Sequence, residues 1–331
     1  MAKITIKDVA KMAGVCTSTV SRVLSGSKDI SDATCEKVHE AVKKLNYTPN
    51  SAARSLRCDK THSIGVVFPD ISGEFYALCA SALLKYAREA GYTVLFTESG
   101  HNMQSEKAAV NALLERCVDG MIFIGDGNDN SLVNEIFQRS IPVVTGDRKV
   151  MDIPSVTFNN RETVREMVKK LYLSGRRRFV YVGQPTEGPD NLIERYGGFT
   201  DALAEYNDVE MITIFDEALH INKPRFAYEL FNKKIMHYKP DAIVTSHDLI
   251  AQGIINAAHS AGLNIPKDIA VTGFDNMLLS EYLIPSITTV HQDADMLAYK
   301  CFELLIKQIN KEDVESFEIK QSIIQRDSAK F

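Results

Sequence analysis

The chain of 331 residues contains no tryptophan, and only 8% of its residues are aromatic. A binding site in this protein therefore lacks the indole ring on which many sugars stack. Long apolar runs are absent too, since no run approaches the roughly 18 residues that a membrane-spanning helix needs. The N-terminus also lacks the apolar core of a secretory signal. We therefore expect a cytoplasmic protein that makes no contact with a membrane.

The cysteines are few, and they form no C-x-x-C pair and follow no regular spacing. The six are Cys16, Cys35, Cys58, Cys79, Cys117 and Cys301. A disulfide-stapled or zinc-binding domain would space its cysteines regularly. We expect buried or free thiols in a reducing compartment, which agrees with the cytoplasm.

Motifs of catalysis are missing as well. The sequence has no G-x-S-x-G elbow, no P-loop and no G-x-G-x-x-G after a strand, so it offers no visible site for nucleophilic or nucleotide-dependent chemistry. Residues 126–130 have the oxygen ligands of a calcium loop, but Ser131 stands where that loop needs glycine and Phe137 where it needs glutamate. We expect no enzyme activity, no metal site and no cofactor.

Charge divides the chain into two parts of opposite sign. Residues 1–60 hold eight Lys and three Arg against four Asp and two Glu, a net charge of +5, whereas the whole chain carries −5. The remaining residues therefore carry −10. Because phosphate binding is mainly electrostatic, this balance favours nucleic-acid contact through the N-terminal part alone.

The apolar spacing of this basic part predicts two short helices and a third that closes them into a small unit. Thr5 can cap the first helix together with Asp8, and Gly14 ends it. The apolar face of the first helix carries Ile6, Val9, Ala10 and Ala13, that of the second Val20, Val23 and Leu24, and that of the third, capped by Ser31, Val38, Ala41, Val42 and Leu45. The solvent side of the second helix carries Thr17, Ser18, Ser21 and Arg22, which suit a DNA major groove. Two ordinary packed helices would show the same spacing, but the positive charge favours the DNA-binding interpretation.

Residues 47–57 have two interpretations. Pro49 and Asn50 break the third helix, and Ala52 to Arg57 can begin a short new one. On DNA this piece can order, with Leu56 as an apolar wedge in the minor groove and Arg54 and Arg57 against phosphates. A flexible linker is the alternative that the residues alone leave open.

The remaining residues, roughly 270 in number, are more than a single domain usually contains. Their predicted strands and helices alternate in two successive series. Apolar strands are predicted at 64–68, 94–96, 121–124, 142–145 and 156–158, with helices near 78–90 and 104–117. The second series has strands at 179–182, 211–215, 242–245 and 269–272, with helices near 161–174, 196–206, 224–236 and 249–261. Short, nearly continuous apolar strands belong in parallel sheets covered on both faces. Two doubly wound lobes of this kind bind a ligand between them, at the carboxyl ends of their strands.

The chain resembles the LacI/GalR family of bacterial repressors. The resemblance lies in Val9-Ala10, Ala13-Gly14-Val15, Thr19-Val20-Ser21-Arg22-Val23, the Asn46-Tyr-x-Pro-Asn50 stretch and Gly273-Phe274-Asp275-Asn276, and it extends over nearly the whole chain. It implies an all-α helix-turn-helix DNA-binding head on an α/β body of two doubly wound, periplasmic-binding-protein-like lobes. Cys16 departs from the family, which usually has Ser or Thr there, so we expect a weaker helix cap.

The resemblance also implies the domain boundaries and the DNA contacts. The head is expected at 1–46, the hinge helix or linker at 47–61, the N-terminal lobe at 62–160 plus about 293–318, and the C-terminal lobe at 161–292 plus about 319–331. The chain would then cross between the lobes three times. Thr17, Ser18 and Arg22 are expected at base edges and Leu56 between bases at the operator centre. The full expected DNA-binding set is Thr5, Thr17, Ser18, Thr19, Ser21, Arg22, Asn50, Ala53, Leu56 and Arg57.

Polar and aromatic residues at strand ends are the candidates for the small-molecule effector site. They are Asp70, Phe75, Tyr76, Asp147, Phe158, Arg195, His247 and Asp275. Arg195, in the stretch that looks like the family's Arg-x-x-Gly-aromatic element, can bind two ligand oxygens at once, and Asp275 can accept from ligand hydroxyls. His247 can contact a ligand or give pH sensitivity, or its ring can be satisfied by loop carbonyls. Phe75 or Tyr76 can belong to the core instead, and Asp147 can merely cap a loop.

The expected function is a transcriptional repressor that binds a palindromic double-stranded operator as a homodimer, with a tetramer left open, and responds to an effector. A neutral sugar fits the site best. A phosphosugar would need more positive charge, for which Arg148, Lys149 and His247 are the candidates, and a purine can stack on Phe75 and Tyr76. The rival, a sugar-transport receptor or sugar enzyme, would need a signal sequence or a paired acid and base.

Overall fold

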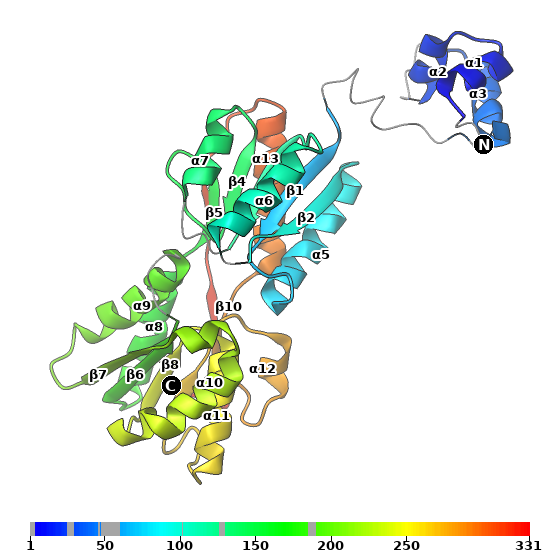
Figure 1. The fold of residues 1–331 in the computed structure, drawn as a ribbon. Helices are drawn as coiled ribbons and strands as arrows, with labels where there is room; N and C mark the ends of the chain where they lie inside the picture. Colours follow the sequence, from blue (N-terminus) through cyan, green and yellow to red (C-terminus); the bar gives the residue numbers. More distant parts are fainter. Residues whose placement is uncertain are drawn as a thin grey trace. The chain divides into compact units, whose positions relative to one another are not determined.

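The computed structural model describes residues 4–24, 30–45, 47, 60–100, 102–125, 130–184 and 190–331 of the chain (Figure 1). The chain divides into two compact units, residues 1–61 and 62–331. The first unit is the helical head and the second is the two-lobed body.

The head consists of α1 (Ile6–Ala13), α2 (Thr17–Leu24) and α3 (Asp32–Leu45). Its core is formed by Val9, Ala10, Val20, Val23, Val38 and Ala41, all from the predicted apolar faces. The predicted cap of α1 is present, because the Asp8 carboxylate accepts hydrogen bonds from the Thr5 N–H at 2.8 Å and the Thr5 hydroxyl at 2.7 Å. Gly14 ends α1 in the left-handed conformation, with φ of 66°.

The first lobe is built on a six-stranded parallel sheet in the order β11-β5-β4-β3-β1-β2. The strands are β1 (Ser63–Phe68), β2 (Thr93–Glu98), β3 (Gly120–Ile124), β4 (Val143–Gly146), β5 (Ser155–Phe158) and β11 (Phe317–Ile319). Helices α5 (Glu74–Glu89) and α13 (Ala294–Ile309) cover one face, and α6 (Met103–Leu114) and α7 (Ser131–Gln138) cover the other. In β3, Ile122 and Ile124 pack toward the first face and Met121 and Phe123 toward the second. Burial on both faces explains the unbroken apolar runs.

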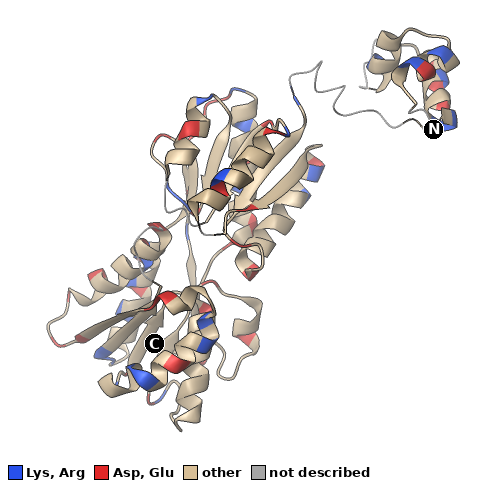
Figure 2. Cartoon of the chain, in the orientation of Figure 1, with Lys and Arg blue, Asp and Glu red and all other residues tan. Residues whose placement is uncertain are grey.

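The second lobe repeats this design with a four-stranded parallel sheet in the order β7-β6-β8-β9. Its strands are β6 (Arg178–Gly183), β7 (Glu210–Phe215), β8 (Ala242–Thr245) and β9 (Ala270–Thr272). On one face lie η1 (Glu217–His220), α10 (Lys223–Lys233), η2 (Ile235–Tyr238) and α11 (Asp248–Ser260), and on the other α8 (Asn160–Leu173) and α9 (Asp190–Leu203). In Figure 2 the strands of both sheets are almost free of charged residues, which lie mainly on helices and loops.

The described residues pass between the lobes at three places. β5 is followed by α8, β10 (Thr289–His291) by α13, and β11 by β12 (Ser322–Ile324), which pairs antiparallel with β10. After β12 the chain stays with the second lobe, where the Val271 N–H donates to the Ser328 carbonyl at 2.9 Å. Each lobe is therefore assembled from separate parts of the sequence.

The structure corrects several expected elements. α9 begins at Asp190 rather than near residue 196, α5 begins at Glu74 rather than near 78, and α6 ends at Leu114 rather than near 117. α7, α12 (Leu278–Tyr282), α13, η1, η2 and β10 to β12 had no counterpart in the sequence analysis. Except for the 16-residue helix α13, which the sequence analysis missed, these elements are short, so their apolar spacing is too brief to separate them from loops. No helix in the described parts of the chain is long and apolar enough to cross a membrane.

Candidate functional site

Seven of the eight residues proposed for the effector site line one cavity of about 150 Å³. Asp70, Phe75, Tyr76 and Asp147 come from the first lobe, and Arg195, His247 and Asp275 from the second. Six of them follow a strand or open the helix after it, and Arg195 lies on α9, the helix after β6, so the carboxyl edges of the two sheets face the same cavity. The expectation that ligands bind at the carboxyl ends of the strands therefore pointed to this cavity.

Phe158 is the residue that the cavity does not include. Its side chain is buried in the core of the first lobe, and its ring contacts Phe75 edge-on with 6.3 Å between centroids. It also borders a second, larger groove beside the lobe crossing. Phe158 thus supports the ring of Phe75 from behind.

Arg195, on α9, is 2% exposed and is held by three neighbours. Its Nη1 donates to the Ser246 carbonyl at 2.8 Å, and the same nitrogen lies 3.7 Å from Oδ1 of Asp275. The guanidinium stacks on Phe274 with its carbon 3.8 Å from the ring centroid. Nε of Arg195 is buried and has no hydrogen-bond partner among the described residues. This N–H is therefore available to a ligand oxygen at the cavity wall.

Asp275 is held in an unusual backbone conformation, with φ of 113°. Its Oδ1 accepts a hydrogen bond from Nε2 of Gln292 at 2.7 Å, which joins the second lobe to the segment that leads into α13. Burial raises the pKa of Asp275 to about 7, although Arg195 opposes this shift. Burial likewise raises the pKa of the neighbouring Asp248 to about 6. The two carboxyls interact, so they titrate as a pair near neutral pH.

This pair predicts a pH dependence of stability. The folded pKa of Asp275 lies above the value of roughly 3.9 expected in the unfolded chain, so folding takes up a proton between about pH 4 and 7. The stability that Asp275 contributes is therefore complete below pH 4 and declines as the pH rises to about 7. Urea unfolding at pH 4 to 8 should show the wild type losing up to ~1.4 kcal/mol per pH unit relative to Asp275→Asn between about pH 4 and 7, with the loss levelling off above pH 7. Parallel curves for the two proteins would contradict this assignment.

His247 is neutral in this environment. Burial by the surrounding walls, followed by the charges of Lys223, Arg195 and His220, holds the pKa of His247 well below its usual value. Its Nδ1 lies 2.9 Å from the Ser246 hydroxyl, so a side chain rather than a loop carbonyl satisfies the ring. The pH sensitivity considered for His247 is thus not supported near neutral pH.

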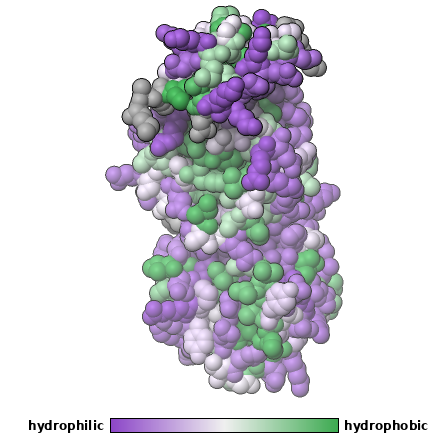
Figure 3. Space-filling model, turned by 90° about the vertical axis from the view of Figure 1, so that its right-hand side faces the viewer, coloured by the Kyte–Doolittle hydropathy of each residue, from purple (hydrophilic) through white to green (hydrophobic). Residues whose placement is uncertain are grey.

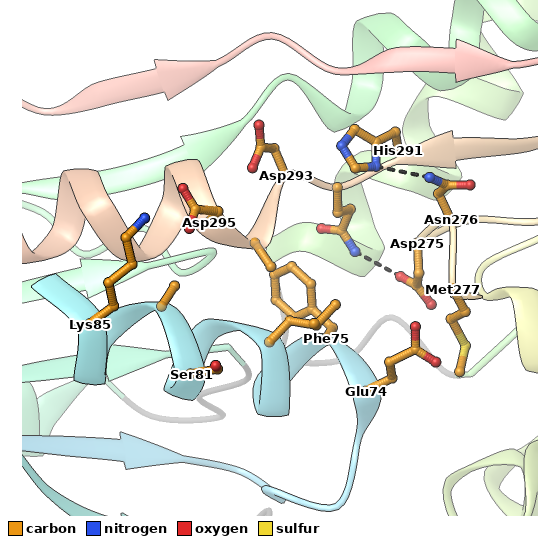
Figure 4. A pocket seen from close by; sticks show the side chains of 14 residues that line it. Glu74, Phe75, Ser81, Lys85, Asp275, Asn276, Met277, His291, Asp293 and Asp295 are labelled. Atoms are coloured by element: carbon orange, nitrogen blue, oxygen red, sulfur yellow. Dashed lines mark hydrogen bonds between the residues drawn. The ribbon is translucent and has the colours of Figure 1, made fainter. Parts of the chain in front are cut away.

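Two carboxylates of the first lobe reach across the cavity to the second. Oδ2 of Asp147 accepts from Nδ2 of Asn191 on α9 at 2.8 Å, and Oε1 of Glu74 accepts from the Leu278 N–H at 2.6 Å. Glu74 also lines an adjoining cavity of about 390 Å³ between α5 and residues 275–277 and 291–295, where Figure 4 shows its carboxylate near Asp275 and Met277. Asp147 is therefore more than a loop cap, since it helps to hold the two lobes together.

Sequence reasoning missed part of the cavity wall. Gln184, Asn191, His220, Lys223 and Gln292 also line it. Gln184 follows β6 directly, so a search for polar residues at strand ends should have found it. His220 and Lys223 reach the cavity from η1 and α10, and neither residue follows a strand directly. Arg148, considered as a source of positive charge, instead forms a buried ion pair with Glu106 at 2.7 Å. Lys149 borders the larger groove rather than this cavity.

The head presents α2 as its polar surface. Ser18 and Arg22 are exposed, and Thr17, Thr19 and Ser21 are half-buried. Sγ of Cys16 lies 2.9 Å from the Ser18 hydroxyl and 3.0 Å from the Thr19 hydroxyl. These contacts, Ser18 first, lower the pKa of Cys16 to about 7, so part of the thiol is ionised at neutral pH. Thr5, also proposed as a DNA contact, is exposed at the start of α1, whereas the other proposed contacts, Asn50, Ala53, Leu56 and Arg57, lie outside the described residues.

Comparison with known proteins identifies the family. Residues 5–50 match the pattern of "Bacterial regulatory proteins, lacI family", and residues 168–329 match a "Periplasmic binding protein-like domain". The chain is 34% identical over 331 residues to the ribose operon repressor of Halalkalibacterium halodurans, covering 98% of this chain and 97% of that one. It is 33% identical over 320 residues to catabolite control protein A of Priestia megaterium, covering 95% of each. The chain belongs to the LacI family of bacterial regulatory proteins.

The LacI-family fold extends from the head to the C-terminus. A crystal structure of the lac repressor dimer bound to operator and the anti-inducer ONPF matches 99% of each chain with a TM-score of 0.86 at 24% identity, a likeness of fold. The expected fold class and the resemblance are therefore confirmed. As a LacI-family protein, this chain is a DNA-binding transcription regulator rather than an enzyme.

Proposed function

We propose that this regulator is a cytoplasmic repressor that binds a palindromic operator as a dimer and changes its DNA affinity when a small molecule occupies the cavity. One observation carries the proposal: the same chain joins a head whose α2 exposes Ser18 and Arg22 to a cavity lined by two lobes. A ligand that contacts both lobes favours one lobe arrangement over another, which is what effector control of a distant head requires.

Exposed apolar residues on the body support dimerisation. Leu78 and Leu84 are exposed on α5, and Leu278, Leu279 and Tyr282 on α12. Figure 3 looks onto the side of the body where these helices lie in Figure 1, and apolar residues gather on its lower half. Apolar surface gathered in this way is typical of protein interfaces. Two heads related by a two-fold axis would match the symmetry of a palindrome.

A sugar is the proposed effector class. Hydroxyl groups suit a wall of carboxylates, amides and one arginine, such as Asp147, Asn191, Arg195 and Gln292. One of the relatives named above is a ribose operon repressor. The rings of Phe75 and Tyr76 supply the apolar face that a sugar or a purine needs, so a purine is the second candidate.

The test is selection of DNA fragments from a random pool by the full-length protein. We expect enrichment of sites with two-fold symmetry, bound by two chains in analytical ultracentrifugation. A pool that remains unenriched would overturn the repressor proposal. A sugar-transport receptor or a sugar enzyme would retain its activity without residues 1–60, and operator binding would not.

Arg22→Ala should weaken binding to the selected operator by at least about tenfold, since a good arginine contact to a base contributes about 1 to 3 kcal/mol. Binding to unrelated DNA should fall much less. Fluorescence anisotropy with both DNAs measures the ratio. Arg88→Ala removes the same charge from α5 and serves as the control, and equal losses in the two variants would show that Arg22 does not read bases.

A further inference from the structure

The positive charge in the effector cavity is concentrated on its second-lobe wall. The cations Arg195 and Lys223 line the cavity from this lobe, as does the ring of His220, whereas the acidic side chains Asp70, Glu74 and Asp147 line it from the first. Asp275 is the acidic exception, and it lies against Arg195. A ligand would therefore meet opposite charges at its two ends.

Lys223 is the cation on this wall that forms no ion pair with the described residues. It is half-buried, and its ammonium makes no hydrogen bond or ion pair with any of the described residues. Its charge nevertheless reaches into the cavity, because it helps to lower the pKa of His247, after burial, and opposes the rise in the pKa of Asp275. Lys223 is also the first residue of the 11-residue helix α10, whose N-terminal N–H groups add positive potential.

The same cavity is lined by Gln184, an amide whose oxygen has no partner among the described residues. Gln184 is 5% exposed, and its Nε2 lies 3.1 Å from Nδ1 of His220, which holds the side chain in place. Its Oε1 is buried and has no hydrogen-bond partner among the described residues. A buried polar atom without a partner costs free energy, so it indicates that a donor arrives with the ligand. The buried Nε of Arg195 likewise lacks an acceptor among these residues.

We propose that the effector is an acidic sugar, a polyol carrying one carboxylate or phosphate, whose anionic group binds Lys223 and His220. Its hydroxyls then donate to Oε1 of Gln184 and to the first-lobe carboxylates, and one of its oxygens accepts from Nε of Arg195. A neutral sugar would leave the half-buried ammonium of Lys223 without an ion pair. This inference rests on the proposed effector site and narrows its ligand class.

The test is calorimetric titration of the full-length protein with matched sugar pairs. The pairs are glucose with glucose 6-phosphate, glucose with glucuronate, galactose with galacturonate, and ribose with ribose 5-phosphate. We expect at least one acid to bind about tenfold or more tightly than its neutral parent, as a charge-assisted contact provides. The pairs also distinguish carboxylate from phosphate.

Lys223→Gln should remove that preference, lowering the affinity for the acid about tenfold and changing that for the parent little. The matched control is Lys233→Gln at the far end of α10, where Lys233 pairs with Glu229 at 3.0 Å. A thermal melt without ligand checks that each variant folds. Preference for a neutral parent, an unchanged acid affinity in Lys223→Gln, or no binding by any acid would each overturn the inference. A bound neutral sugar would still support the proposed effector site, and DNA selection tests the repressor proposal separately.

Discussion

Replacing Arg195 by alanine should abolish the response of the protein to any sugar or sugar acid that stabilises the wild type. The guanidinium provides the unpartnered Nε at the cavity wall, and it fixes Asp275 and the Ser246 carbonyl at that wall. The variant should also lose stability, on the order of 3 kcal/mol, because truncation leaves the buried Asp275 carboxyl without its cation. Thermal melts with and without the sugar pairs measure both effects.

Two further variants separate binding from folding. Arg195→Lys keeps the positive charge but loses the planar fork, so it should recover part of the stability and little of the ligand response. Arg165→Ala breaks an exposed ion pair with Glu205 and should leave both quantities nearly unchanged. If Arg195→Ala kept a wild-type ligand shift, the assignment of this cavity as the effector site would be wrong.

Gly273→Ala should destabilise the second lobe by about 3 kcal/mol or more, at the upper end for an overpacked site. A Cβ at this position would lie 2.0 Å from Oδ1 of Asp248 and 3.0 Å from Cγ2 of Ile287. The Asp248 carboxylate is held firmly, since it accepts from the Ser280 hydroxyl at 2.6 Å, the Thr289 hydroxyl at 2.6 Å and the Met277 N–H at 2.9 Å. Urea unfolding of the variant measures the loss.

A double-mutant cycle identifies the cause of that loss. In an Asp248→Ala background the obstructing carboxylate is gone, so Gly273→Ala should cost much less than it does in the wild type. The two changes should therefore be non-additive by about 1 to 3 kcal/mol. Additive losses would mean that the glycine is required for its backbone or for the contact with Ile287, rather than for the space that Asp248 occupies.

Much of the fold follows from local patterns in the sequence. In the head, the buried residues Val9, Val20 and Val38 each belong to an apolar face with helical spacing. Gly14 ends α1 in the left-handed backbone conformation, which glycine adopts without strain. In the body, runs such as Met121 to Ile124 are apolar on both faces, which is enough to predict buried parallel strands. Strand ends then predicted the cavity, because parallel strands present their carboxyl ends at one edge.

The tertiary structure decided which side chains of that cavity have partners. The sequence pattern singles out Arg195 and Asp275, but it does not reveal that Lys223 and His220 approach the cavity from η1 and α10, or that Arg148 turns away to pair with Glu106. Nor does the pattern show why Gly273, just after β9, must be glycine, since the obstruction comes from Asp248 at the start of α11. The sequence by itself determined the DNA-binding head, the two α/β lobes and the edge at which the cavity lies, because periodicity and strand ends are local properties. The charge of the cavity depends on contacts between residues distant in the chain, which only folding brings together.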